Sequence, residues 1–102
     1  MKVRLTEQAQ EDARRIRRWW RTNRTKAPNR FSEELREARK RLSVAPHEGQ
    51  AYRDLNGELV RRLLLEKSGQ HVYYVVREAE RLVSVVAIHG AMRGSGPDLA
   101  ER

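Results

Sequence analysis

The sequence predicts an α+β fold of element order β-α-α-β-β-β, in which a helical hairpin packs on one face of a small, mainly antiparallel sheet. Three observations lead to this prediction. Two segments in the first half repeat apolar residues with the spacing of an amphipathic helix. Three segments in the second half are rich in β-branched and aromatic residues, which is typical of strands. The connections between these strands are short enough that only antiparallel hairpins fit.

Both helices have recognisable ends. Thr6 can cap the first helix through its hydroxyl group. Pro28 suits the first turn of the second helix, which ends by Pro46 because proline cannot continue a helix. The short polar connection between the two predicts a helical hairpin. The apolar faces, each with a four-three-four spacing, are Ala9, Ala13, Ile16 and Trp20 in the first helix and Phe31, Leu35, Ala38 and Leu42 in the second.

The strands are predicted from alternation and from residue type. Val3 and Leu5 alternate with basic residues and indicate a short first strand. Residues 46–57 are predicted to be irregular and to end in an Asn-Gly turn. The later strands are predicted over residues 59–65, 71–76 and 82–88.

Alternation along the strands also separates the two faces of the sheet. One face must be covered by the helical hairpin, and the other is then open to solvent or to a partner. The residues assigned to the helix-covered core are Val72, Tyr74, Val76, Val86 and Ile88, and those assigned to the open face are Arg62, His71, Tyr73 and His89.

Length and charge limit what this chain can be. Its 102 residues suit one domain, which we place at residues 1–90 with a tail at residues 91–102. The net charge is +8, and only four of the 22 basic residues are lysines. Arginine binds phosphate and carboxylate in a bidentate manner, so the composition indicates nucleic acid or an acidic protein as partner. The alternative is that the arginines are ordinary solvated surface residues.

Several classes of protein are not expected. Absence of cysteine excludes disulfides and thiolate metal sites, and the three histidines lack the spacing of metal ligands, so we expect no metal and no cofactor. The N-terminus has no apolar segment typical of a signal peptide, and no apolar run approaches the ~20 residues needed to cross a bilayer. The sequence therefore predicts a cytoplasmic protein without a membrane partner.

One group of arginine and histidine residues on the strands and in the tail could catalyse a reaction. Arginine can stabilise a pentavalent phosphate, and histidine can move protons, so such a set could cleave RNA with the 2′-hydroxyl as nucleophile. The alternative is that these are polar residues on an exposed sheet face or contacts for a protein partner, and the sequence alone favours this alternative. The candidate catalytic residues under the nuclease hypothesis are Arg62, His71, His89 and Arg93.

Short motifs along nearly the whole chain can be compared with known families. They are Trp19-Trp20, Ala27-Pro28, Phe31 and Glu34-Leu35 in the hairpin, Ala45-Pro46, Gly49 and Tyr52 in the following loop, and residues 60–65, 71–74 and 86–97 in the strands and tail. Together these motifs resemble toxins of the RelE/ParE superfamily, from type II toxin–antitoxin pairs. The strand and tail motifs are closer to the ParE, or plasmid-stabilisation, branch.

The resemblance implies a growth-inhibiting toxin that is neutralised by a cognate antitoxin in a heteromeric complex. The antitoxin of such a pair has a segment that wraps the toxin and a domain that binds DNA, so contact with DNA is expected mainly through the antitoxin. A basic toxin and an acidic, partly disordered antitoxin are suited to coupled folding and binding.

The resemblance leaves two activities open. RelE-like members cleave mRNA on the ribosome, whereas ParE-like members inhibit DNA gyrase and are not nucleases. Leu64 stands where a RelE nuclease tends to have lysine, His71 stands where arginine is common, and no tyrosine follows Arg93. We therefore favour gyrase inhibition without enzymatic activity, with the ribosome-dependent endoribonuclease as alternative and a basic nucleic-acid-binding module as second alternative.

The antitoxin or target is expected to contact the open sheet face or the helical hairpin. The candidate contact residues are Arg14 and Arg18 on the first helix and Arg61, Arg62, Tyr73, His89 and Arg93 on the strands and tail.

Overall fold

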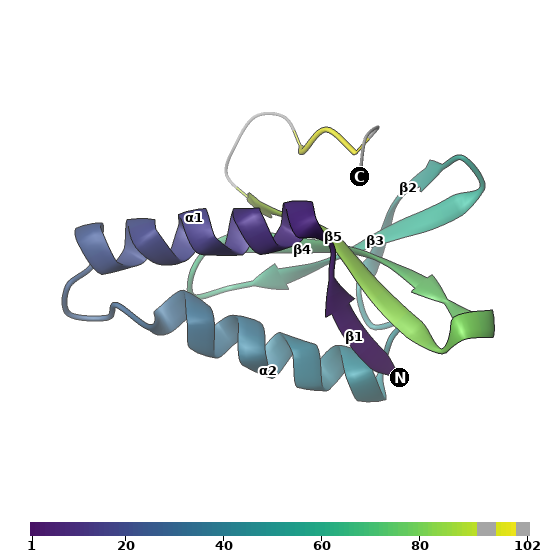
Figure 1. The fold of residues 1–102 in the computed structure, drawn as a ribbon, viewed down its shortest axis with the longest axis horizontal. Coiled ribbons are helices and arrows are strands. Elements are labelled where there is room, and N and C mark those ends of the chain that lie inside the picture. Colours follow the sequence, from purple (N-terminus) through teal and green to yellow (C-terminus); the bar gives the residue numbers. More distant parts are fainter. Residues whose placement is uncertain (92–95, 100–102) are drawn as a thin grey trace.

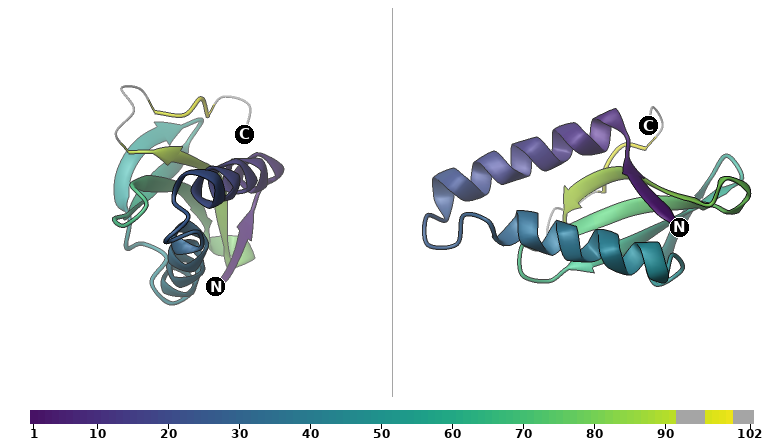
Figure 2. Two further views of the ribbon diagram at one scale, coloured as in Figure 1. Left: turned by 90° about the vertical axis from the view of Figure 1, so that its left-hand side faces the viewer. Right: turned by 60° about the horizontal axis from the view of Figure 1, so that its bottom comes forward.

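The computed structural model of the chain describes residues 1–91 and 96–99. Five strands form one sheet in the order β1-β5-β4-β3-β2, and both helices lie on one face of that sheet (Figure 1, Figure 2). The predicted α+β fold with a helical hairpin on the sheet is confirmed. The elements are β1 (Lys2–Leu5), α1 (Glu7–Asn23), α2 (Arg30–Val44), β2 (Gln50–Leu55), β3 (Glu58–Leu65), β4 (Gln70–Arg77), the 3-10 turn η1 (Glu78–Glu80) and β5 (Leu82–Gly90).

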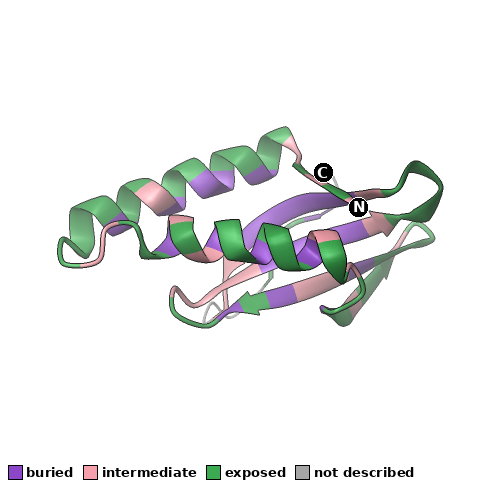
Figure 3. Ribbon diagram, turned by 90° about the horizontal axis from the view of Figure 1, so that it is seen from below, coloured by how far each residue is buried: buried purple, intermediate pink, exposed green. Residues whose placement is uncertain are grey.

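The two helices turn buried residues toward the sheet and exposed residues outward (Figure 3). The Thr6 hydroxyl accepts a hydrogen bond from the Ala9 N–H at 3.2 Å and caps α1 as predicted. α2 begins at Arg30, two residues after Pro28, because the chain first closes a turn in which the Arg30 N–H donates to the Ala27 carbonyl. All eight predicted apolar positions of the two helices are buried. Within the described residues, neither helix is long and apolar enough to cross a membrane.

β2 is a strand that the sequence pattern does not reveal. Residues 50–55 pair antiparallel with β3, although residues 46–57 are predicted to be irregular. The hairpin between them turns at Asn56 and Gly57, whose φ angles of 53° and 85° suit the tight turns that favour Asn-Gly. Only Tyr52 and Leu55 are partly buried in this strand, so it lacks the apolar alternation that marks the others. Backbone pairing with β3, rather than side-chain burial, therefore defines β2.

A bulge in β5 changes which of its side chains face the helices. Tyr73 pairs with Ala87 while Tyr74 pairs with Val85, which leaves Val86 as an extra residue. Val83, Val85 and Ile88 consequently lie in the helix-side core, whereas Val86 lies in the cluster on the opposite face. The assignment of Val86 to the helix-side core was wrong, because simple alternation cannot pass through a bulge. The other four assigned core residues do pack on the helix side.

Asp12 of α1 accepts a hydrogen bond from the part of the β5 edge that β1 does not reach. β1 pairs in parallel with β5 only from Leu82 to Val85. Further along β5, the Ile88 N–H donates to Asp12 Oδ2 at 3.0 Å in a buried hydrogen bond. Asp12 Oδ1 accepts from Gln8 Nε2 and from Arg15 Nη2, each at 3.1 Å. A helix side chain thus takes the place of a strand partner, and the buried backbone N–H is satisfied.

The sheet face away from the helices is also largely apolar and partly covered. Leu99 is only 3% exposed and packs on this face, to which β2 adds the partly buried Tyr52 and Leu55. The prediction of an open face therefore holds for only part of the sheet. The buried residues of this second cluster are Val60, Tyr73, Val75, Val86, Ala87 and Leu99.

Candidate functional site

The strand register brings four predicted site residues together on the face away from the helices. Arg62 is the partner of Tyr73 across β3 and β4, and His71 is the partner of His89 across β4 and β5. Because side chains alternate along a strand, this register places all four on one face. The rings of His71 and Tyr73 pack edge to face, with centroids 5.9 Å apart.

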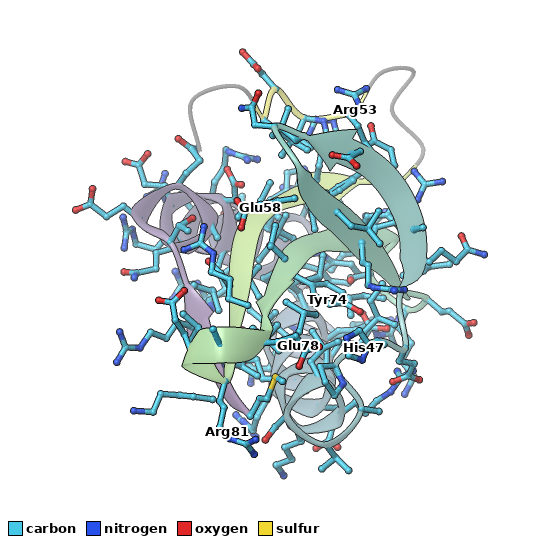
Figure 4. The ribbon with its side chains drawn as sticks, turned by 90° about the vertical axis from the view of Figure 1, so that its right-hand side faces the viewer. His47, Arg53, Glu58, Tyr74, Glu78 and Arg81 are labelled. Carbon is cyan, nitrogen blue, oxygen red and sulfur yellow. The ribbon has the colours of Figure 1, made fainter. Side chains whose placement is uncertain are left out.

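Tyr52 of β2 contacts this group of residues. The sequence pattern did not predict it as a site residue. Its ring packs edge to face on Tyr73, with centroids 5.0 Å apart. The Arg62 guanidinium carbon lies 4.9 Å from the Tyr52 ring centroid, and that of Arg53 lies 5.3 Å from it. Figure 4 shows Arg53 on the β2 side of the molecule, well away from His47 and Glu78. The aromatic residue next to Arg53 was a signal for cation–π contact, but it had no place on a face until β2 was recognised.

Residues 96–99 cover the part of this face that contains Tyr52 and Tyr73. Tyr73 is only 2% exposed, so the expectation that it lies on an open surface was wrong. Gly96 lies so close to Tyr52 that a Cβ at position 96 would clash with the Tyr52 hydroxyl. Tyr73 therefore supports the site by packing and is not accessible to a partner while the tail is in place.

His71 lies where cations and burial both oppose its protonation. Partial burial, followed by the nearby charge of Arg62 and then of His89, lowers the pKa of His71 from its ordinary value of about 6.5. At neutral pH the His71 imidazole is therefore uncharged, which suits a hydrogen-bonding or packing role better than that of a proton donor.

Stability is expected to fall as the pH drops below about 6.5, because the unfolded state then binds a proton at His71 more readily than the folded state does. A His71→Asn variant should lose less free energy of unfolding than the wild type between about pH 7.5 and pH 5. Urea denaturation at the two pH values measures this difference. Gln50→Asn, an exposed substitution that leaves every titratable group in place, should retain the wild-type loss. An equal loss in the wild type and in His71→Asn would contradict the assignment.

The other predicted contact residues lie elsewhere. Arg61 points to the opposite side of β3, where its Nη1 donates to the carbonyls of His47 at 3.3 Å and of Gly49 at 2.9 Å. It holds the loop before β2 in place. Arg14 and Arg18 lie on exposed positions of α1. Arg93 lies outside the described residues.

The same loop is tied to the β4–β5 connection by a polar contact between His47 and Glu78. His47 Nε2 lies 2.7 Å from Glu78 Oε1, and Figure 4 shows these two side chains close together. The Tyr74 hydroxyl accepts a hydrogen bond from the Gly49 N–H at 2.8 Å, and burial raises the pKa of Tyr74. These contacts fix where β2 begins, and therefore where Tyr52 lies on the site face.

A groove lies beside the exposed edge of β3, next to the part of the sheet that residues 96–99 and β2 cover. Leu64 pairs with His71 across β3 and β4 and is 44% exposed. β2 pairs with β3 only as far as Arg62, so Leu64 lies on a part of β3 with no partner strand on that side within the described residues. The groove between this edge and α2 measures about 510 Å³ and includes Arg62, Leu64 and His71 in its lining. Its lining combines Leu64 and the neutral His71 imidazole with side chains of both charges, which are Arg41, Arg62 and Lys67 and Glu34, Glu37, Glu48 and Glu66.

One protein family matches a stretch of the chain that contains almost all of the elements just described. The family described as the ParE toxin of the type II toxin-antitoxin system, parDE, matches residues 3–93. The chain belongs to the ParE toxin family. A comparison with curated proteins found no match.

Membership gives the site its biological setting. A ParE-family toxin is one half of a type II toxin–antitoxin system, so this toxin has an antitoxin partner. The match runs from β1 through β5 and so includes Tyr52, Arg62, His71, Tyr73 and His89. The sheet face and the adjoining groove are therefore part of the family domain and not an addition to it.

Proposed function

We propose that this ParE-family toxin inhibits DNA gyrase by binding it, that it acts in the cytoplasm, and that a cognate acidic antitoxin neutralises it. The observation that supports a binding role is the composition of the sheet face. Tyr73 is buried, and Arg62 stacks on Tyr52. On β3 the residue facing His71 is Leu64, which cannot transfer a proton, so only His89 of β5 could share acid–base work with His71. Such a face favours packing against a protein over acid–base catalysis.

The antitoxin is proposed to bind at the groove between β3 and α2. Leu64 can pack against an apolar side chain there, and Arg62 can pair with an acidic one. The lining also contains Glu34, Glu37, Glu48 and Glu66, so the attraction for an acidic segment comes from Arg62 and from the net charge of +8, not from the groove as a whole. The one-sided pairing of β3 beyond Arg62 leaves room for an extended segment to approach its edge. Groove binding would also bring the antitoxin close to the site residues.

One observation supports the alternative function, which is ribonuclease activity. Arg62, His71 and His89 do share one sheet face, as a phosphate-cleaving site would require. The neutral state of His71 would allow it to act as a base but not as an acid. A test of function must therefore distinguish the two activities directly.

Purified toxin is expected to inhibit supercoiling of relaxed plasmid by gyrase, and an excess of antitoxin should restore it. A His71→Ala/His89→Ala variant should inhibit gyrase within about threefold of the wild type, because binding does not need proton transfer. Mapping of mRNA 5′ ends after induction in cells provides the other readout. The proposal is wrong if gyrase is unaffected while new 5′ ends appear in the wild type and disappear in the double variant.

A further inference from the structure

A second groove, separate from the sheet face, lies among β1, α1 and α2. β1 runs between the start of α1 and the end of α2 (Figure 1, Figure 2). The groove there measures about 380 Å³, and its lining includes Arg4, Arg14, Arg17 and Arg39 together with Gln10. No aspartate or glutamate among the described residues lines it. Three separate elements thus contribute cations to one concave surface.

Among the described residues, no ion pair joins any of these four arginines to a carboxylate. The ion pairs of arginine and lysine in the described part of the chain use Arg15, Lys40, Arg41 and Arg77. Arg39 donates to the carbonyl of Val3 at 3.2 Å, which leaves its charge uncompensated. Like charges gathered in this way repel one another and oppose folding. A bound anion would remove that repulsion.

We propose that this groove binds the phosphodiester backbone of a nucleic acid. Guanidinium groups bind phosphate oxygens through paired, charge-assisted hydrogen bonds. Arg14 and Arg17 are three residues apart on α1, so they lie on neighbouring turns and face the same side. Arg39 of α2 lines the same groove, so cations from both helices can contact one backbone.

The lining favours a phosphate backbone over an acidic peptide. A peptide partner needs apolar side chains to bury, and the large exposed apolar residues of the described chain all lie outside this groove. These residues are Trp19, Val44, Leu59 and Leu64. Among the described residues, the only apolar ones in its lining are Leu5 and Ala13, so four arginines and Gln10 dominate the groove, which is the pattern of phosphate recognition.

This inference does not depend on the proposed target. A toxin bound to gyrase would meet duplex DNA, and a toxin bound to the ribosome would meet RNA. It does differ from the expectation that contact with DNA is made mainly through the antitoxin, since the toxin would add a contact of its own. DNA and RNA share the phosphodiester chemistry, so the experiment must separate them.

Fluorescence anisotropy of the full-length toxin with a labelled duplex DNA, a duplex RNA and a poly-glutamate peptide tests the proposal. The groove variant is Arg14→Gln/Arg17→Gln/Arg39→Gln. The matched control is Lys26→Gln/Lys67→Gln/Arg81→Gln, which removes the same charge outside the groove. Titrations between about 50 and 200 mM salt give the slope of log affinity against log salt concentration for each protein.

The groove variant is expected to bind nucleic acid on the order of 100-fold more weakly than the wild type, with a salt slope smaller by about 2.7, because three phosphate contacts are lost. The control should stay within about threefold of the wild type. A stronger interaction of the wild type with duplex DNA than with RNA would identify DNA as the source of the backbone, and the reverse would identify RNA.

Three results would overturn the proposal. One is equal loss of affinity in the groove variant and the control, which would indicate a general charge effect. Another is absence of nucleic-acid binding by the wild type at low salt. The third is tighter groove-dependent binding of poly-glutamate than of either nucleic acid, which would assign the groove to an acidic protein. If thermal denaturation shows that the triple variant is unfolded, Arg14→Gln/Arg17→Gln keeps the Arg39 bond and should reduce the slope by about 1.8.

Discussion

Replacement of Gly49 by alanine is expected to destabilise the toxin by about 3 kcal/mol, because the added methyl group has no space. A Cβ at position 49 would lie 2.6 Å from the Tyr74 hydroxyl oxygen and 2.8 Å from the Arg62 carbonyl oxygen. The Arg62 carbonyl belongs to the backbone of β3 and cannot move without disturbing its pairing. The added Cβ also weakens the hydrogen bond from the Gly49 N–H to Tyr74. Urea denaturation monitored by tryptophan fluorescence measures the loss.

A second substitution checks the cause. Tyr74→Phe removes one of the two obstructing oxygens but leaves the Gly49 N–H without its partner, so it should cost about 1 kcal/mol on its own. The double variant Gly49→Ala/Tyr74→Phe should then lose less than the sum of the two single losses, because the clash with the hydroxyl is gone. Stability of Gly49→Ala within about 0.5 kcal/mol of the wild type would show that the loop relaxes freely and that the explanation is wrong.

Replacement of Asp12 by alanine is expected to cost about 2 to 3 kcal/mol, because it leaves the buried Ile88 N–H without an acceptor. The substitution also removes the contacts of the carboxylate with Gln8 and Arg15. Amide hydrogen exchange gives a local readout, since the Ile88 amide should lose protection beyond the global change. Chemical denaturation gives the total free energy of unfolding.

Two variants define the contribution of the carboxylate. Asp12→Asn keeps one side-chain oxygen that can accept from Ile88, so it should retain a good part of the stability. Glu11→Ala removes an exposed neighbouring carboxylate and should stay within about 0.5 kcal/mol of the wild type. If the Ile88 amide of Asp12→Ala is as protected as in the wild type, α1 does not complete the edge of β5 in the way described.

Periodicity predicted most elements of the fold. The four-three-four spacing identified both helices and every one of their buried apolar residues, because a helix places residues three and four apart on one face. β4 and β5 were predicted from their β-branched and aromatic composition, within two residues at each end. β2 was not, because it buries little and depends on hydrogen bonds to β3. The bulge at Val86 could not be predicted either, since both neighbours of that residue are also apolar.

The candidate site was predicted in part. Alternation and register agree in placing Arg62, His71, Tyr73 and His89 on one face. Tyr52 was missed because its strand was missed. The burial of Tyr73 could not be inferred from its own strand, because the segment that covers it follows more than twenty residues later in the chain.

The sequence by itself determined the strong positive charge, the helical hairpin and the presence of Arg62, His71 and His89 on one face of the sheet, because these depend on composition and on residues close together along the chain. The tertiary structure decided which surfaces remain open. Asp12 meets Ile88 across 76 positions of sequence, the tail segment meets Tyr52 and Tyr73, and arginines from β1, α1 and α2 meet in one groove. Such contacts between distant residues leave no local pattern, so only the folded chain shows where a partner can bind.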